Sequence, residues 1–264
     1  MKEESYLIKF EDVSFIREGH NTILDSINWQ VAPKENWAIL GLNGSGKTTL
    51  LQLITGYLWP TKGNLTVLGE RFGQTSIPDL RKQIGWVSSA LSYQMKGHFL
   101  AEDIVLSGKF ATIGIHQIVS LEEQAEAREL LTACGGSQLI GKTFDVMSQG
   151  QRQITLIARA LMAKPPLLIL DEPCNGLDLF AREQLLERIH SIANTPDAPN
   201  LLFVTHYTEE LLPCFDNLIL LKEGKIFDQG KTTDLLTKTQ LERFYDKPVK
   251  LIPMADNRVT VVPN

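Results

Sequence analysis

The chain has 264 residues, 43% of them apolar, and a formal net charge of −5. This length and composition predict a substantial core, in one large domain or in a domain with a subdomain. The acidic balance disfavours a general nucleic-acid-binding surface. No apolar stretch approaches the ~18 residues of a membrane span, and residues 1–4 do not begin a signal peptide. We therefore expect a chain that does not itself cross a membrane.

The cysteines point to a reducing compartment. Cys134, Cys174 and Cys214 are odd in number, widely spaced and without a C-x-x-C pair. This pattern predicts reduced thiols in a cytosolic protein, packed as small apolar groups.

Short apolar runs typical of strands fill the N-terminal region. They cover residues 6–10, 12–16, 22–24 and 27–31. Runs of this length, bounded by turn residues and ended by Pro33, predict an antiparallel β layer.

A phosphate-loop motif follows the buried strand predicted over residues 37–40. The motif fits G-x-x-x-x-G-K-[ST], and helical spacing follows it up to a predicted stop at Gly56. Its residues are Gly41, Leu42, Asn43, Gly44, Ser45, Gly46, Lys47 and Thr48, followed by Thr49. A hairpin turn at Asn43-Gly44 is the alternative, but no period-2 alternation follows. The strand–loop–helix context therefore predicts binding of a nucleoside triphosphate.

The types of residue in this motif explain the chemistry. Glycines let backbone N–H groups approach phosphate oxygens, and the N-terminus of a helix favours their negative charge. We expect Lys47 to reach the β- and γ-phosphates and the Thr48 hydroxyl to ligate Mg²⁺.

The middle of the chain changes character. Short strands are predicted at residues 64–69 and 86–89, after which strand signals fade from about residue 95 to 143. Helical periodicity appears at residues 102–106 and 121–134, and an apolar helix at 151–163. The unbroken apolar run 167–170 is typical of a parallel strand covered on both faces. We therefore predict an α/β core with an inserted helical subdomain at about residues 95–165.

The last third returns to strands. An amphipathic helix is predicted at residues 180–192, a buried strand at 201–204, and a hairpin from 218–221 and 225–227. A last short helix at 234–237 and one or two edge strands within 244–264 complete the prediction.

Two carboxylates follow the apolar strand. Asp171 stands at its carboxyl end, where it can lie near Mg²⁺ directly or through water. Glu172 points differently and could polarise a water that attacks the γ-phosphate. The alternative is a strand that simply ends in acidic loop residues.

A hydroxyl and open backbone N–H groups begin the helix at residues 151–163. Ser148, Gln149, Gly150 and Gln151 there make an anion site, or else Ser148 is an ordinary N-cap. Their position just upstream of the carboxylate strand favours the anion site.

With these motifs in this order, the chain resembles the nucleotide-binding domain of ABC ATPases over roughly residues 6–237. Residues 148–151 resemble the family's signature sequence, although Gln149 stands where Gly is usual. Residues 175–178 resemble the D-loop, and Thr205-His206 resembles the switch histidine. A phosphate-loop kinase or GTPase would leave residues 148–151 and His206 without roles, and no Asn-Lys-x-Asp for guanine is present.

The resemblance implies a head-to-tail homodimer with two MgATP at its interface. In that arrangement Ser148, Gly150 and Gln151 act in trans on the γ-phosphate, and Asp178 couples the two sites.

The resemblance also implies catalytic roles. Glu172 is then the general base, and His206 holds the γ-phosphate and the attacking water in register. On the residues alone, His206 could instead cap the next helix.

Two positions depart from the family pattern. The Gln that contacts Mg²⁺ is replaced by Ser89, which could still reach the metal through a water, and Gln94 could substitute only in a shifted loop. The Val-Ser-Ser sequence here is similar to a subgroup that includes molybdate-linked ATP-binding proteins. The aromatic that stacks on adenine falls near Arg17, so Arg17, Phe15 or a tail aromatic remains open for that role.

Two functions are compatible with an ATPase of this kind. The first is the ATP-hydrolysing subunit of an ABC transporter, which drives separate integral-membrane permease subunits from the cytoplasmic face of the membrane. The alternative is a soluble ABC ATPase that acts as a switch on nucleic acid or ribosomes, although the acidic charge provides no basic footprint. Residues 1–240 are the expected ATPase domain, and 241–264 a short C-terminal extension.

Overall fold

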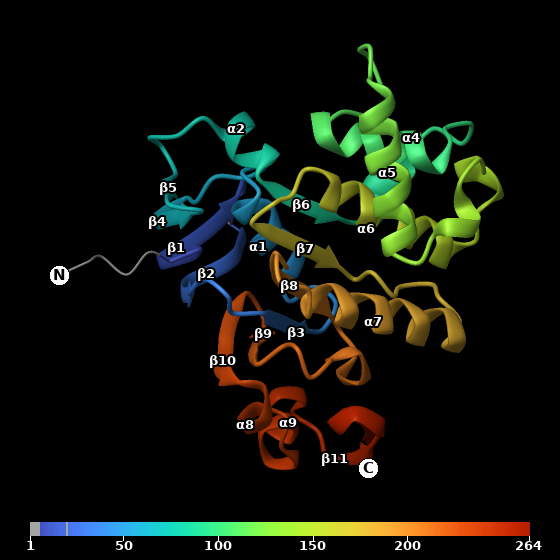
Figure 1. Cartoon of the computed structure of the whole chain (residues 1–264). Helices are drawn as coiled ribbons and strands as arrows, with labels where there is room; N and C mark the ends of the chain where they lie inside the picture. Colours follow the sequence, from blue (N-terminus) through green and yellow to red (C-terminus); the bar gives the residue numbers. More distant parts are fainter. Residues whose placement is uncertain (1–5, 20) are drawn as a thin grey trace. The chain divides into compact units, whose positions relative to one another are not determined.

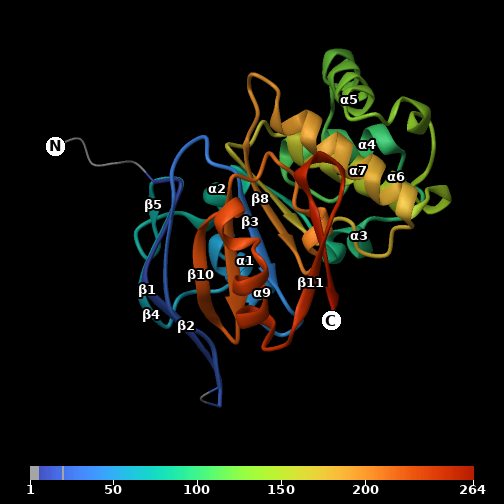
Figure 2. The same ribbon diagram turned by 90° about the horizontal axis from the view of Figure 1, so that it is seen from below.

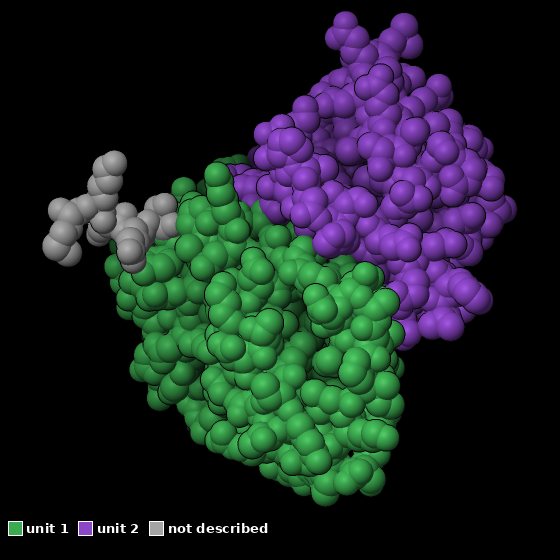
Figure 3. Space-filling view, turned by 60° about the horizontal axis from the view of Figure 1, so that its bottom comes forward, with its two compact units in different colours: residues 1–81, 200–264 green, residues 82–199 purple. Residues whose placement is uncertain are grey.

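The computed structural model describes residues 6–19 and 21–264, so the expectation about residues 1–4 lies outside it. The chain divides into two compact units, which are described separately (Figure 3). Unit 1 comprises Met1–Arg81 and Asn200–Asn264, and unit 2 comprises Lys82–Pro199. In the described part of the chain, no helix is both long enough and apolar enough to span a bilayer.

The N-terminal layer of unit 1 is an antiparallel sheet (Figure 1). Its strands, in the order β2-β1-β4-β5, are β1 (Ile8–Arg17), β2 (Asn21–Val31), β4 (Lys62–Val67) and β5 (Glu70–Arg71). The four short strands predicted here are in fact two long ones. Asp12 and Ser26 adopt left-handed backbone conformations where the β1–β2 register shifts, so the apparent breaks are bulges.

A second sheet in unit 1 is mainly parallel. Strands β3 (Trp37–Gly41), β8 (Asn200–Thr205) and β9 (Asn217–Lys222) run in parallel with β3 in the centre, and β10 (Lys225–Lys231) pairs with β9 as a hairpin. All five residues of β3 are buried, as the apolar run predicts. Helix α1 (Lys47–Ile54) follows β3, and Gly56 lies just beyond its end with positive φ, as expected.

Unit 2 combines a parallel strand pair with packed helices. Strand β6 (Ile84–Val87) pairs with β7 (Leu167–Asp171). Helices α4 (Ala101–Ser107), α5 (Leu121–Ala133) and α6 (Gln149–Met162) pack on one another, and α7 (Leu179–Ala193) packs on α6. These helices confirm the predicted periodicity. Helix α6 begins two residues earlier than expected because Ser148 caps it.

Shorter elements complete the chain. They are α2 (Ile77–Lys82), α3 (Ser89–Gln94) and the 3₁₀ turns η1 (Gly108–Phe110), η2 (Ser137–Leu139), η3 (Phe144–Val146), η4 (Thr208–Glu210) and η5 (Ala255–Asn257).

The C-terminal part of unit 1 differs from the prediction. Helix α8 (Thr232–Leu235) is followed by a second helix, α9 (Lys238–Tyr245), which Thr237 caps by accepting a hydrogen bond from the Gln240 N–H. Strands β11 (Val249–Pro253) and β12 (Val259–Pro263) then pair with each other as a two-stranded sheet. Strand β11 packs against α9 (Figure 2).

Candidate functional site

The phosphate loop connects β3 to α1, and its own backbone requires its glycines. Gly44 and Gly46 have φ of 80° and 103°, which side chains other than glycine rarely adopt. A Cβ on Gly41 would lie 2.5 Å from the Ser45 Oγ and 2.8 Å from the Leu221 carbonyl oxygen. The loop therefore excludes larger residues at these positions by conformation or by contact.

Polar groups converge on the inside of this loop. The Lys47 side chain is 6% exposed, and its Nζ donates hydrogen bonds to the carbonyls of Gly41 at 2.7 Å and Leu42 at 3.2 Å. The Ser45 hydroxyl is buried and has no hydrogen-bond partner among the described residues. An amine and an unsatisfied hydroxyl beside the first turn of a helix fit the oxygens of a polyphosphate.

His206 emerges at the same edge of this sheet. Leu40 pairs with Thr205 in the parallel register of β3 and β8, so the residue after Thr205 stands beside the start of the loop. The Thr205 hydroxyl accepts a hydrogen bond from the Tyr207 N–H at 3.0 Å and donates one to Glu210 Oε2 at 2.5 Å. His206 does not cap the following turn, because the cap position of η4 belongs to Tyr207. Sequence reasoning missed Glu210, whose buried carboxylate holds this turn.

In unit 2 the predicted carboxylates lie at the carboxyl end of β7. Asp171 ends the strand, and Glu172 has φ of 48°, a left-handed conformation that costs a non-glycine residue about 1–3 kcal/mol. The Glu172 carbonyl accepts a hydrogen bond from the Asn175 N–H at 3.1 Å, which closes the turn. Strained residues of this kind occur preferentially at functional sites.

The hydroxyl nearest to Asp171 in the strand register is that of Ser88. Val87 pairs with Leu170, so Ser88 and Asp171 follow at one edge of the β6–β7 pair. Ser88 is buried and accepts a hydrogen bond from the Leu91 N–H at 3.3 Å as the cap of α3. Ser89 is exposed in the first turn of α3, and Gln94 ends that helix. The cap preference for serine before a helix could have identified Ser88 from the sequence.

The signature segment begins α6 with a capping box. Ser148 Oγ accepts a hydrogen bond from the Gln151 N–H at 3.3 Å, and Gln151 Oε1 accepts one from the Ser148 N–H at 3.1 Å. The ordinary capping role of Ser148 is therefore present, and its side chain is exposed. A Cβ on Gly150 would lie 3.5 Å from the Ala181 Cβ, an ordinary contact. The fold of one chain does not require glycine there.

The D-loop segment lies next to the start of α6. Leu177 and Ala181 are the neighbours that a Cβ on Gly150 would meet. Asp178 caps α7 by accepting a hydrogen bond from the Ala181 N–H at 2.9 Å, and its side chain is exposed. The structure thus brings the signature segment and the D-loop together within unit 2.

The three candidates for adenine stacking lie at exposed or half-buried positions. Arg17 is exposed at the end of β1, Phe15 is half-buried two residues earlier, and the tail aromatic Tyr245 is half-buried at the end of α9.

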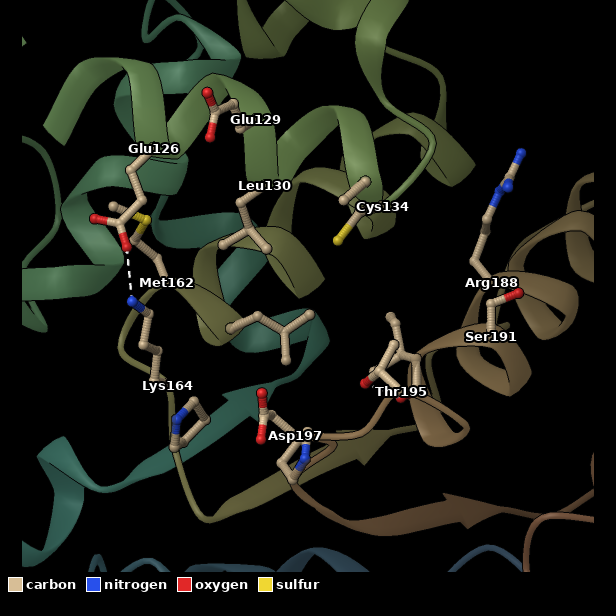
Figure 4. A pocket seen from close by; sticks show the side chains of 15 residues that line it. Glu126, Glu129, Leu130, Cys134, Met162, Lys164, Arg188, Ser191, Thr195 and Asp197 are labelled. Carbon is tan, nitrogen blue, oxygen red and sulfur yellow. Dashed lines mark hydrogen bonds and ion pairs between the residues drawn. The ribbon is translucent and has the colours of Figure 1, made fainter. Parts of the chain in front are cut away.

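A cavity of about 690 Å³ occupies a different part of unit 2 (Figure 4). It lies among α5, the end of α6 and α7, and Glu126 and Lys164 form an ion pair of 2.9 Å in its lining. None of the predicted site residues lines it. Burial raises the pKa of the Cys134 thiol in its wall to about 11.

Two of the three cysteines are packed as expected. Cys134 and Cys174 are buried, Cys214 is half-buried, and no disulfide joins cysteines in the described chain. Burial also raises the pKa of Cys214 to about 12.

Comparison with known proteins identifies the class. The family model described as "ABC transporter" matches residues 24–175, more than half of the chain. The uncharacterized ABC transporter ATP-binding protein YlmA of Bacillus subtilis (strain 168) is 44% identical over 247 residues, which cover 93% of this chain and 93% of YlmA. YmeB of Lactococcus lactis subsp. lactis (strain IL1403), with the same description, is 42% identical over 245 residues, 93% of this chain and 94% of YmeB.

A solved structure agrees with the sequence relatives. The structure of cbiO1 from Clostridium perfringens, described as part of the ABC transporter complex cbiONQ, matches with a TM-score of 0.78 and 26% identity. The match covers 91% of this chain and 94% of cbiO1. The chain therefore belongs to the ABC transporter family, as an ATP-binding subunit with the mixed α/β fold of the ABC ATPases.

Proposed function

We propose that two copies of this chain close around two MgATP, and that closure and hydrolysis drive separate integral-membrane subunits. The observation that carries this proposal is Gly150. It begins the signature helix beside an exposed serine, yet the fold of a single chain leaves room for a Cβ there. A glycine that its own chain does not need supports close approach by another molecule.

The phosphate loop binds ATP. Its backbone N–H groups and the α1 N-terminus hold the phosphates, and the Lys47 amine turns from the loop carbonyls to the β- and γ-phosphates. The proposed ATP contacts are Gly41, Leu42, Asn43, Gly44, Ser45, Gly46, Lys47, Thr48 and Thr49.

Magnesium fits the oxygen donors available. The exposed Thr48 hydroxyl in the first turn of α1 and the Asp171 carboxylate at the end of β7 are hard ligands of the kind that Mg²⁺ prefers. Ser89 is a further donor through a water. When bound, Mg²⁺ neutralises charge that develops on the β- and γ-phosphate oxygens.

Hydrolysis uses Glu172 and His206. The Glu172 carboxylate accepts a proton from the attacking water, and its strained backbone supports a role beyond ending a strand. His206 donates a hydrogen bond to the γ-phosphate and keeps the water in line.

The second copy completes each site. Ser148, Gly150 and Gln151 of one copy bind the γ-phosphate held by the other, with the serine hydroxyl and open N–H groups as donors. Asp178, exposed at the start of α7, couples the two sites across the interface.

The partners are permease subunits, and the chain lies at the cytoplasmic face of the membrane. Support comes from the family and from cbiO1, which is itself part of a transporter complex. We assign residues 1–240 to the ATPase domain, with the helical subdomain at about 95–165 inserted in it, and 241–264 to an extension.

The test is Glu172→Gln, followed by size-exclusion chromatography with ATP. We expect binding to persist, hydrolysis to fall by about 10²–10⁴, the range of general-base catalysis, and a dimer to accumulate. Glu187→Gln, an exposed glutamate on α7, is the matched control and should behave as wild type. Full turnover by Glu172→Gln would remove Glu172 from the base role, and a monomer at saturating ATP would contradict the dimer.

A further inference from the structure

The C-terminal hairpin, made of β11, the turn Ala255–Asn257 and β12, contacts the segment that follows His206. Strand β12 packs against η4 (Thr208–Glu210), and both belong to unit 1. Figure 2 shows β11, in red, alongside α9. This contact joins the extension, which the proposed catalytic roles do not use, to the turn that follows the switch histidine.

Two side chains of the hairpin bind one residue of that segment. Arg258, which is only 6% exposed, donates a hydrogen bond from Nη1 to the Glu209 carbonyl at 3.0 Å. Thr260 Oγ1 donates a hydrogen bond to Glu209 Oε2 at 3.3 Å. The backbone and the side chain of Glu209 are thus both held by the hairpin, through Arg258 just before β12 and Thr260 within it.

The same segment is held from its other end by β8. Thr205 accepts a hydrogen bond from the Tyr207 N–H and donates one to the buried Glu210 carboxylate. His206 therefore lies in a short turn with one attachment at the strand end and another at the hairpin.

Helix α9, which precedes the hairpin, holds the start of β11. Leu241 and Phe244 of α9 are buried, and the Val249 N–H at the start of β11 donates a hydrogen bond to Glu242 Oε1 at 3.3 Å. The Asn264 N–H donates one to the Pro248 carbonyl at 3.2 Å, which ties the two open ends of the hairpin. A contact made from such a support restricts the segment it touches.

The ionisable groups near Glu209 are consistent with its being held by Arg258. Burial, and then the nearby Glu209 carboxylate, raise the pKa of Tyr245 to about 12, so this phenol stays neutral beside the acid. The buried Arg258 guanidinium supplies the positive charge on the hairpin side. Hydrogen bonds from a charged donor are stronger than those between neutral groups.

We propose that the C-terminal hairpin is a positioning device for His206, with Arg258 as the principal positioning residue and Thr260 as the second. By fixing Glu209, they hold the turn that carries His206 in the orientation used for hydrolysis. The inference rests on the proposed role of His206 and adds to it a task for the C-terminal extension.

The experiment compares steady-state ATP hydrolysis by Arg258→Ala, Arg258→Lys and Thr260→Val. We expect Arg258→Ala to lower kcat about tenfold, the loss of one charge-assisted hydrogen bond, while KM stays within about twofold because the phosphate loop is untouched. Arg258→Lys, which keeps a charged donor, should restore part of kcat, and Thr260→Val should have the smaller effect. Lys250→Ala, an exposed cation on β11, is the matched control and should leave kcat unchanged.

Amide hydrogen exchange separates positioning from general loss of structure. In Arg258→Ala we expect faster exchange in a peptide covering residues 205–210 and unchanged exchange in one covering 41–48. A wild-type kcat in Arg258→Ala, or faster exchange in both peptides, would overturn the proposal. A wild-type chain without ATPase activity would instead contradict the proposed function, and His206→Ala with full activity would remove the residue through which Arg258 acts.

Discussion

The phosphate loop and the signature segment are both glycine-containing starts of helices, but they differ in what requires the glycine. At Gly41 a Cβ would collide with Ser45 and with the Leu221 carbonyl, and Gly46 has a backbone that favours glycine. At Gly150 the backbone is helical, and a Cβ would make an ordinary contact with Ala181.

The phosphate loop is therefore a site that one chain forms by itself, whereas the signature segment is proposed to need another molecule. In the phosphate loop, the loop carbonyls and the Lys47 amine already bond to one another, so the cradle is preformed. In the signature segment, Ser148 and Gln151 satisfy each other and Gly150 has no structural task. The role proposed for Gly150 in trans accounts for a feature that folding alone leaves unexplained.

Removing the lysine of the preformed cradle should have the largest effect. We expect Lys47→Ala to weaken ATP binding by about 100-fold, because charge-assisted hydrogen bonds to the phosphates are lost. Equilibrium titration with a fluorescent ATP analogue measures this. Lys62→Ala, an exposed lysine on β4, is the control. Unchanged affinity in Lys47→Ala would mean that the loop does not hold the triphosphate.

Adding one methyl group to each glycine tests the comparison directly. Gly41→Ala should lower the free energy of unfolding by about 1–3 kcal/mol, the cost of overpacking. Gly150→Ala should raise the free energy of unfolding by less than about 1 kcal/mol, because alanine has a higher helix propensity than glycine but the position lies in the first turn. It should nevertheless lower hydrolysis about tenfold. Urea unfolding and phosphate release measure the two quantities. If Gly150→Ala kept full activity, the close approach proposed for this glycine would be wrong.

A smaller effect on hydrolysis is expected from Ser89, the proposed donor to Mg²⁺ through a water. Ser89→Ala should lower hydrolysis only about threefold, the size of a weak hydrogen bond through a water. Ser88→Ala, which removes the cap of α3, should instead lower stability by about 1 kcal/mol. Complete loss of activity in Ser89→Ala would make that hydroxyl a direct metal ligand.

The last prediction concerns the pH dependence of stability that two cysteine thiols confer. The pKa of Cys134 in unit 2 is about 11 and that of Cys214 in unit 1 about 12, whereas thiols of an unfolded chain titrate near ~8.5. Above that pH the folded state binds more protons than the unfolded state, so the free energy of unfolding should fall as pH rises, by about 1 kcal/mol per thiol near pH ~9.5. Urea unfolding at pH 8 and 9.5 checks this, and replacing both cysteines by alanine should flatten the slope. A slope of unchanged size in that double variant would contradict the assignment.

Local patterns predicted the elements that carry the phosphate loop and the carboxylates. The apolar runs that became β3, β7 and β8 are buried on both sides, and the helical periods of α5 and α6 survive in the fold. The order of the parallel strands then places His206 beside the loop, although the two are far apart in sequence.

Contacts between distant residues escaped prediction. Nothing near Arg258 indicates that it bonds to Glu209, 49 residues earlier, because no period or motif links them. The bulges at Asp12 and Ser26 were also invisible, since a bulge interrupts the alternation that identifies a strand. Helix α9 did leave a signal: Thr237 as a cap, and Leu241 and Phe244 on one face.

The left-handed backbone of Glu172 has a consequence for engineering. Glycine and asparagine adopt this conformation with less strain than glutamate does, so either would relieve part of the cost at this position. Directed evolution that selected only for heat resistance would drift toward those replacements and discard the carboxylate proposed as the base. Libraries meant to yield a more stable ATP-binding subunit should therefore keep codon 172 constant.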